Sequence, residues 1–469
     1  MGRERRGTSG PGAPVNPAPS PPSGQADHAG TGGHLRGDSG SGAAPFGRIL
    51  FRGGLIALVI QGGGQLLRYL WQVGFARWMG VEEFGSFSFA FGWIQVLAIL
   101  CALGLTTGAL RFVPEYISRS QWGLLRGIVR RSSQMTFVAG AGIALLGTLT
   151  ILILPMEEGR RNTLALGMWL VPLLGLGNLK LELTRSTRDV ARAYFPMRIL
   201  LPALAAALGY LAWGGGDRMT AGQGLYALAG ALALTLLVQE ILLGQALPSE
   251  GRRAPPEFRT RFWLSESFPL LLIAGFVILL NQTDIIMVGA LAGDEEVGLY
   301  ASASVTARWV SFMLLSANAV AAPMIAGLHA EGDKASLQAL VTRVARWTFW
   351  PSLALAAVLI LGAGPVLDLF GEDFAQARWA LVILVSGQVV NAAMGPVGHL
   401  MNLTGHGRES AVVYGTAAGV NVALNLLLIP VMGMEGAAVA TATSVILWNL
   451  WLFVLVRRKV GVHSFFLGG

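Results

Sequence analysis

The chain has 469 residues, of which 53% are hydrophobic and only 13% carry a formal charge. Soluble globular domains carry about 25% charged residues, so this composition excludes an ordinary soluble enzyme and indicates a surface that faces lipid. The net charge of +8 does not indicate nucleic-acid binding, because the basic residues lie between apolar runs and form no basic domain.

In chain order, the sequence divides into five parts. Residues 1–47 are rich in Pro, Gly and Ser and lack an apolar run, so we expect a disordered cytoplasmic tail. Apolar runs then fill a first lobe, 48–244, and a second lobe, 265–458, which a polar connector, 245–264, separates. A short cytoplasmic tail, 459–469, follows the second lobe.

Each lobe holds six apolar runs that are long enough to cross a bilayer, which takes about 20 helical residues. We therefore predict an all-α polytopic membrane protein with about twelve transmembrane helices. The predicted spans are 53–76, 84–106, 134–155, 163–182, 194–213, 223–244, 266–291, 297–326, 344–363, 377–400, 409–430 and 435–456.

The distribution of Lys and Arg predicts the orientation, because cytoplasmic connectors of membrane proteins are enriched in both residues. The two tails and every second connector together hold 26 of the 34 basic residues. The opposite connectors hold five and are rich in Asp and Glu. Twelve spans place both termini on the same side, so we expect both termini in the cytoplasm.

A repeat relates the two lobes. The segment WMGVEEFGSFSFA (Trp78–Ala90) matches LAGDEEVGLYASA (Leu291–Ala303), and its matching positions recur at a constant offset in residue number. Four pairs share this offset: Gly80 and Gly293, Glu82 and Glu295, Glu83 and Glu296, Gly85 and Gly298. Six spans per lobe give both lobes the same orientation, so we predict two parallel six-helix repeats around a central cavity, the plan of an alternating-access transporter.

Several segments resemble one family. They are FARWMGVEEFGSFSFA with FVPEY, then NQTDIIMVGALAG, then LTGHGRES followed by VNVALNLLLIPVMGMEGAAVATATS. Together they resemble the polysaccharide-biosynthesis (O-antigen, Wzx-like) branch of the multidrug/oligosaccharidyl-lipid/polysaccharide (MOP) exporter superfamily, over roughly residues 50–458. The long Pro-rich tail departs from that branch.

The resemblance implies a MOP/MATE-like fold in the bacterial cytoplasmic membrane, without a cofactor or metal. It implies a flippase that moves a polyprenyl-pyrophosphate-linked oligosaccharide from the cytoplasmic to the outer leaflet, surrounded by membrane lipids. A polysaccharide polymerase or glycosyltransferases are the protein partners it implies.

Charged residues inside the predicted spans are the candidate site. Such a charge costs about 2.5–3.5 kcal/mol on insertion scales, so it usually faces a cavity or a partner. Arg68 and Asn281 are related by the offset of the repeat and should face each other across the cavity. We expect Arg68 and Arg308 to bind the pyrophosphate, because guanidinium groups suit phosphate oxygens, with Asn281 and Gln282 beside them. Asp284 is expected to balance the arginines in the empty state and to take a coupling proton or Na⁺.

An alternative is that one arginine forms a structural pair with Asp284 and touches no substrate. Arg198 and Glu240 lie near cytoplasmic span ends and are expected to extend to the membrane surface. Asn421 and Asn425, like Asn391, either line the second lobe's cavity or hydrogen-bond between helices.

Enzyme motifs are lacking. No Gly-x-x-x-x-Gly-Lys loop for nucleotide phosphates occurs, and His399 and His406 are spaced so that no metal-binding pair shares a helical face. Pro172 and Pro396 each interrupt the fourth span of a lobe and predict kinks there.

Three functions compete. The flippase predicts a cationic cavity, whereas a multidrug/cation antiporter of the same superfamily would favour carboxylates within the membrane. A membrane-embedded glycosyltransferase would need a large outer loop, and all outer connectors here are short. We therefore expect a flippase and no enzyme activity, with the glycan and the coupling ion left open.

Overall fold

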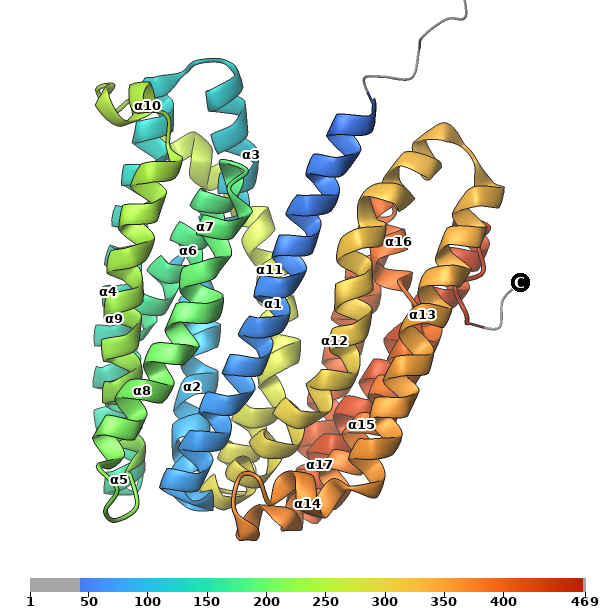
Figure 1. Cartoon of the computed structure of the whole chain (residues 1–469). Helices are drawn as coiled ribbons and strands as arrows, with labels where there is room; N and C mark the ends of the chain where they lie inside the picture. Colours follow the sequence, from blue (N-terminus) through green and yellow to red (C-terminus); the bar gives the residue numbers. More distant parts are fainter. Residues whose placement is uncertain (1–42, 467–469) are drawn as a thin grey trace, which may run out of the picture. The chain divides into compact units, whose positions relative to one another are not determined.

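The computed structural model describes residues 43–466, and side chains from residue 59 onward except those of 272–274, 276, 277, 280 and 319. The predicted tail up to residue 42 and the last three residues lie outside this range. Within it the chain is helical and contains no strand (Figure 1). This confirms the predicted all-α class.

The first half of the chain, before the connector, forms α1 (Ala43–Met79), α2 (Val81–Cys101), α3 (Leu105–Ser118), α4 (Trp122–Ile153), α5 (Glu158–Met168), α6 (Val171–Ser186), α7 (Val190–Phe195), a π-helical turn (Pro196–Leu200), α8 (Leu201–Trp213) and α9 (Ala221–Ala246). The connector holds α10 (Ser249–Arg253). The second half forms α11 (Thr260–Leu291), α12 (Asp294–Glu331), α13 (Lys334–Leu361), α14 (Ala363–Leu367), a 3₁₀ turn (Glu372–Ala377), α15 (Arg378–Met394), α16 (Val397–Leu403) and α17 (Gly407–Lys459).

The helices account for all twelve predicted spans. Eight helices in the described part of the chain are long and apolar enough to cross a membrane, or nine if the bent α12 is included. The 53-residue α17 covers the last two predicted spans, because two helices meet in it at Gly433, where φ is +57°. Several helices are longer than their apolar runs: α4 begins at Trp122 although its span was predicted to begin at 134. One basic residue of these additional turns, Arg126, donates a hydrogen bond to the backbone oxygen of Ala254 in the connector.

The predicted interruptions at Pro172 and Pro396 are confirmed. Pro172 lies in the first turn of α6, just after the break that separates α5 from α6. Pro396 precedes α16 and follows Gly395, whose φ is +67°. Proline lacks an amide hydrogen and removes one helical hydrogen bond, which favours a break, and both spans consist of two segments.

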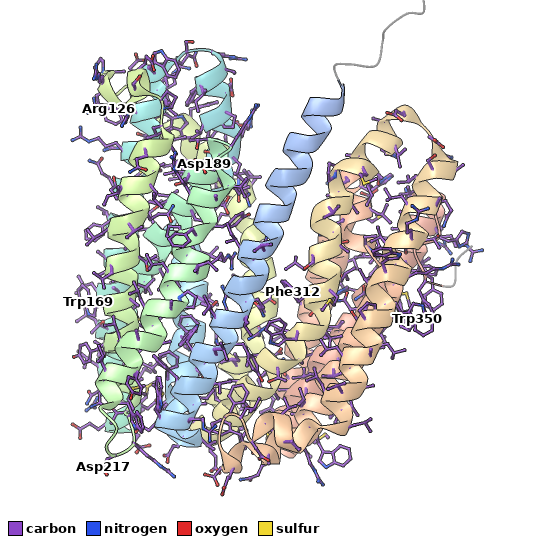
Figure 2. The ribbon with its side chains drawn as sticks, viewed as in Figure 1. Arg126, Trp169, Asp189, Asp217, Phe312 and Trp350 are labelled. Carbon is purple, nitrogen blue, oxygen red and sulfur yellow. The ribbon has the colours of Figure 1, made fainter. Side chains whose placement is uncertain are left out.

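The alternate connectors lie at opposite ends of the helix bundle. Figure 1 shows α3 and α10 at one end and α5 and α14 at the other, and Figure 2 shows Arg126 and Asp217 at these two ends. We call the first the basic end and the second the acidic end, after their connectors. The outer flanks carry exposed apolar side chains such as Leu361 (88% exposed) and Trp347 (79% exposed). Such a surface suits lipid and not water.

The repeated glycines bring α2 and α12 together at the acidic end. Gly80 and Gly293 precede these helices with φ of +78° and +98°, a region that favours glycine. A Cβ atom on Gly85 would lie 1.7 Å from the backbone oxygen of Asp294, and one on Gly298 would lie 2.1 Å from a backbone oxygen of α2. The two helices therefore touch backbone to backbone where the two copies of the repeat meet.

The repeated glutamates have equivalent roles as well. A carboxylate oxygen of Glu83 accepts a hydrogen bond from the amide of Ala221 at 2.6 Å, at the start of α9. Glu296 accepts one from the amide of Met434 at 2.8 Å, at the start of the second helix of α17. The two donors are related by the same offset in residue number as the two acceptors, so the repeat extends to the last span of each half.

The largest part of the apolar core that the halves share lies toward the acidic end. The largest buried cluster includes residues of both halves, and the rings of Phe84 and Phe374 lie 5.9 Å apart within it. Two smaller clusters lie toward the basic end, one around Phe112 and Trp263 and one around Leu452. The space between the halves is therefore not filled by one continuous core.

The described part of the predicted C-terminal tail packs against the second half. Gln338 exchanges two hydrogen bonds with the backbone of His463, at 2.8 Å and 2.7 Å. The ring of Phe466 stacks on Phe349 with 3.8 Å between centroids. Residues 460–466 thus join the fold of the second half at the basic end.

Candidate functional site

A cavity of about 470 Å³ lies between the two halves. Residues of α1, α2, α6, α8 and the π-helical turn form most of its wall. The second half contributes residues of α11 and Arg308 of α12. Figure 2 shows Phe312, one helical turn beyond Arg308, between α1 and α12, where the halves approach each other.

Four of the five predicted site residues line this cavity: Arg68, Asn281, Gln282 and Arg308. Arg68 and Asn281, which occupy equivalent positions in the two repeats, both face it, as the sequence predicts. A nitrogen of the Arg308 guanidinium donates to the hydroxyl of Ser304 at 3.1 Å, one turn earlier on α12. This contact holds the arginine while leaving most of its donors available.

Arg198 is a third cationic wall residue, and the prediction that it extends to the membrane surface is wrong. It lies at the centre of the π-helical turn Pro196–Leu200, which lines the cavity. A Cβ atom on Gly64 of α1 would lie 2.5 Å from the backbone oxygen of Arg198, so this glycine lets α1 lie directly against the turn. π-Turns often mark functional positions in helices, and the prolines at 196 and 202 were the available sequence signal.

The wall is net positive. Glu182 is the one acidic residue among the lining residues, against three arginines. Its carboxylate lies 2.9 Å from a guanidinium nitrogen of Arg185, which is not part of the wall, so its charge is already paired. Glu240, for which the same prediction was made, does have an exposed side chain; it forms an ion pair with Lys180 and does not line the cavity.

Neutral polar and aromatic groups complete the wall. Six carboxamides line it: Gln65, Gln72, Gln95, Asn178, Asn281 and Gln282. Trp71 and Phe91 add aromatic surface. Carboxamides donate and accept hydrogen bonds, as sugar hydroxyls do, and guanidinium groups bind phosphate oxygens through paired hydrogen bonds. The wall can therefore bind an anionic group that is attached to a polar, uncharged one.

Asp284 lies outside the cavity, in a polar cluster of the second half. Its carboxylate accepts hydrogen bonds from Tyr300 at 3.1 Å, Thr441 at 2.5 Å, Asn421 at 3.1 Å and Asn425 at 2.8 Å. Only 5% of the residue is exposed. The ion pairs among the described residues do not include Asp284, so the geometry supports neither its balancing of the arginines nor a structural pair with one of them.

The cluster contains the oxygen ligands that hard cations prefer. Besides the Asp284 carboxylate, Thr441 and both asparagines contribute side-chain oxygens, and the Oδ1 atom of Asn425 is buried without a hydrogen-bond partner. Asn421 and Asn425 thus take the interhelical role that the sequence left open, although neither lines the central cavity. In the described part of the chain no three His, Cys, Asp or Glu residues converge, so a transition-metal site is not indicated there.

The first half shows that the fold itself does not need this cluster. Its positions equivalent by the repeat to Asp284, Tyr300, Asn421, Asn425 and Thr441 hold Trp71, Phe87, Leu208, Ala212 and Leu228. All five are apolar, and the first half packs there without a buried carboxylate. Burying a charge without an ionic partner is costly even when it is hydrogen-bonded, so the presence of Asp284 in one half only indicates a role other than packing.

Comparison with known proteins identifies the family. The profile of the polysaccharide biosynthesis protein family matches residues 50–329, and that of the MatE family matches residues 269–427. The chain belongs to the polysaccharide biosynthesis protein family. One relative of this chain is the probable low-salt glycan biosynthesis flippase Agl15 of Haloferax volcanii. The two sequences are 23% identical over 397 residues. The alignment covers 81% of this chain and 78% of the relative.

Solved structures share the fold of this polysaccharide biosynthesis family member. An inward-facing multidrug resistance MATE transporter of the MOP superfamily matches with a TM-score of 0.67 at 16% identity, over 87% of this chain and 98% of that one. A MOP superfamily transporter from Pyrococcus furiosus, whose binding pocket is described as having reverse polarity, matches with a TM-score of 0.60 at 16% identity, over 88% and 94%. The chain therefore has the fold of MOP superfamily transporters, and its long apolar helices make it a multi-pass membrane protein.

Proposed function

We propose that the protein flips a polyprenyl-pyrophosphate-linked oligosaccharide from the cytoplasmic to the outer leaflet by alternating access. The observation that carries this proposal is the cavity wall, in which Arg68, Arg198 and Arg308 surround a volume of about 470 Å³ that six carboxamides also line. A diphosphate brings about two negative charges, which paired guanidinium groups neutralise, and the carboxamides suit the attached sugars.

The orientation follows from the basic residues. We propose that the basic end faces the cytoplasm of a bacterial cell, with the protein in the cytoplasmic membrane and both termini inside. On this orientation, substrate from glycosyltransferases enters from the basic side, and a polysaccharide polymerase uses it after transport. For the two tails, the two lobes and the 245–264 connector we propose the boundaries that the sequence predicts.

The Asp284 cluster supplies a route to energy coupling. A proton or Na⁺ bound there would neutralise the carboxylate and weaken its hold on Asn421 and Asn425 of α17 and on Tyr300 of α12. Because the cluster joins three helices of the second half, its occupancy would bias which conformation these helices adopt. We propose that ion binding here resets the empty transporter.

Transport by Arg68 variants tests the proposal. In proteoliposomes matched for protein content, Arg68→Ala should slow flipping of a fluorescent polyprenyl-pyrophosphate glycan by about tenfold or more, because a charge-assisted contact contributes about 1.5–3 kcal/mol. Arg68→Lys should also be impaired, since lysine cannot bind phosphate bidentately. Arg77→Ala, on the same helix but in an exposed position outside the cavity, is the matched control. Normal flipping by both Arg68 variants would disprove the cavity's role.

One observation favours the second candidate, an ion-coupled multidrug/cation antiporter: Asp284 is a membrane-buried carboxylate in α11. Efflux of a fluorescent cation from cells distinguishes the two functions. A flippase with this wall should give no efflux above that of cells lacking the protein, because three arginines repel a cationic drug. Efflux that Asp284→Asn abolishes would favour the antiporter.

A further inference from the structure

A second, smaller pocket lies wholly within the second half, toward the basic end. It has a volume of about 160 Å³ and lies between α12, α15, α16 and α17. Neither the family nor the proposed function assigns it a role. Seven of its lining residues carry polar or aromatic side chains: Asn318, Asn391, His399, Asn402, Tyr414, Trp448 and Asn449.

The pocket contains an unsatisfied polar group that suits a ligand. Asn318 is buried, since only 6% of it is exposed, and its Oδ1 atom has no hydrogen-bond partner. The rings of Tyr414 and Trp448, which line the same pocket, meet edge to face with 5.8 Å between their centroids. None of the described residues that line the pocket is an aspartate, glutamate, lysine or arginine. The site therefore offers hydrogen bonds and an aromatic surface without charge.

The repeat relates this pocket to the central cavity. By the constant offset of the repeat, Asn391 of the pocket corresponds to Asn178 of the cavity, and Tyr414 corresponds to Leu201. The pocket is thus the second half's counterpart of the cavity wall that α6 and α8 form in the first half. The two recesses have diverged chemically, because the first contains Arg198 and the second is uncharged.

Helix α12 connects the two sites. Arg308 lies in the cavity wall and Asn318 in the pocket, about three helical turns further along the same helix. At 1.5 Å per residue these positions are about 15 Å apart along the helix axis. This separation is comparable to the length of a short oligosaccharide.

We infer that this pocket binds a neutral sugar residue of the translocated glycan. The inference rests on the proposed flippase function and deepens it: the arginines hold the diphosphate, and the pocket recognises the glycan. A lipid chain would leave the Asn318 oxygen without a partner, and an inorganic cation would find no carboxylate in the wall. Sugar hydroxyls donate to amide oxygens, and the face of a sugar ring packs on indole.

Binding to the purified full-length protein tests this role. One probe is farnesyl diphosphate; the others are farnesyl-diphosphate-linked trisaccharides of glucose, galactose or N-acetylglucosamine. The wild-type protein should bind at least one glycan probe about tenfold more tightly than farnesyl diphosphate, a difference that a few new hydrogen bonds supply. Asn318→Leu and Trp448→Leu should reduce this preference to within about twofold and leave the affinity for farnesyl diphosphate unchanged.

The controls separate the possible failures. Trp451→Leu, one turn further along α17 in an exposed position outside the pocket, should keep the preference. Tyr414→Phe removes a single hydroxyl group. It replaces the other two pocket variants in this test if they unfold the protein. Equal affinity of the wild type for all probes, or preference retained in the pocket variants, would overturn the inference while leaving the flippase proposal intact. If farnesyl diphosphate fails to bind, or binds Arg68→Ala as tightly as wild type, the flippase proposal fails and the inference fails with it.

Discussion

Asp284 and the cavity arginines lie in separate places, although all of them are charged groups within the predicted membrane spans. The carboxylate contacts four neutral donors in the second half, whereas the arginines line the space between the halves. Loss of the carboxylate should therefore affect the conformational cycle and not substrate affinity.

Asp284→Asn tests this separation. The variant should lose stimulation of flipping by a proton or Na⁺ gradient, and its affinity for farnesyl diphosphate should stay within about twofold of wild type. Flipping in proteoliposomes under imposed gradients and equilibrium binding measure the two effects. Asp217→Asn, an exposed loop residue at the acidic end, is the control. A large loss of affinity in Asp284→Asn would contradict the separation.

Arg198 gives a second test at the scale of a single residue. Arg198→Ala should weaken binding of farnesyl diphosphate by about tenfold, because a charge-assisted hydrogen bond contributes about 1.5–3 kcal/mol. The binding should also depend less steeply on salt concentration. Arg192→Ala, in an ion pair with Asp189 outside the cavity, should bind normally. Equal affinities of the two variants would show that Arg198 is only a structural residue.

The sequence alone was enough to predict that four residues line the cavity: Arg68, Arg308, Asn281 and Gln282. A charged or amide side chain in the middle of an apolar run usually faces a cavity or a partner, because facing lipid is costly. It was not enough for Arg198, since the same residue near a span end usually extends to the membrane surface. The partners of Asp284 could not be assigned either: Asn421, Asn425 and Thr441 follow it by 137, 141 and 157 residues. Only the packing of α11 on α17 brings them together.

At the scale of helices, the contact between α2 and α12 depends on the absence of side chains. Gly85 and Gly298 let the backbones touch, since added Cβ atoms would lie only 1.7 Å and 2.1 Å from carbonyl oxygens of the opposite helix. The repeated Gly-x-Glu-Glu pattern revealed the repeat, but the sequence did not show that its two copies contact each other.

Gly85→Ala should separate these helices. We expect a loss of about 1–3 kcal/mol, the usual cost of overpacking, and a lower unfolding temperature in detergent. Gly142→Ala in α4 is the matched control, because nothing lies within 4 Å of its added methyl group. That change should be neutral or stabilising by up to about 1 kcal/mol, as alanine favours helix. Similar melting temperatures for Gly85→Ala and wild type would show that the contact is loose.

At the scale of the whole molecule, Arg160 ties the halves together at the acidic end. From α5 it donates to the backbone oxygen of Gly289 and lies 3.5 Å from the carboxylate of Asp294. Its guanidinium also lies 4.2 Å above the ring of Phe89. These contacts join the first half to α11 and α12 beside the glycine contact, so the acidic end can open only when they break.

Arg160→Ala should therefore favour opening of the acidic end. Spin labels on cysteines introduced at Asp217 and Glu372, one in each half, report the separation of that end. The single native cysteine, Cys101, is fully buried and should not react. We expect a larger population of long distances in Arg160→Ala than in wild type or in Arg161→Ala, the adjacent control. Identical distance distributions in Arg160→Ala and wild type would show that Arg160 does not restrain opening of the acidic end.

The contact between α2 and α12 is self-complementary, since Gly85 meets the start of α12 in the same way that Gly298 meets the start of α2. Interfaces of this kind form between identical subunits related by a twofold axis. Two copies of either half alone would form a homodimer through the same type of helix contact. Two identical subunits, however, must carry the same residue at each position, so such a dimer would hold two Asp284 clusters or none. Covalent fusion of the halves removes this constraint, so that one chain contains a cavity lined by three arginines and a single Asp284 cluster.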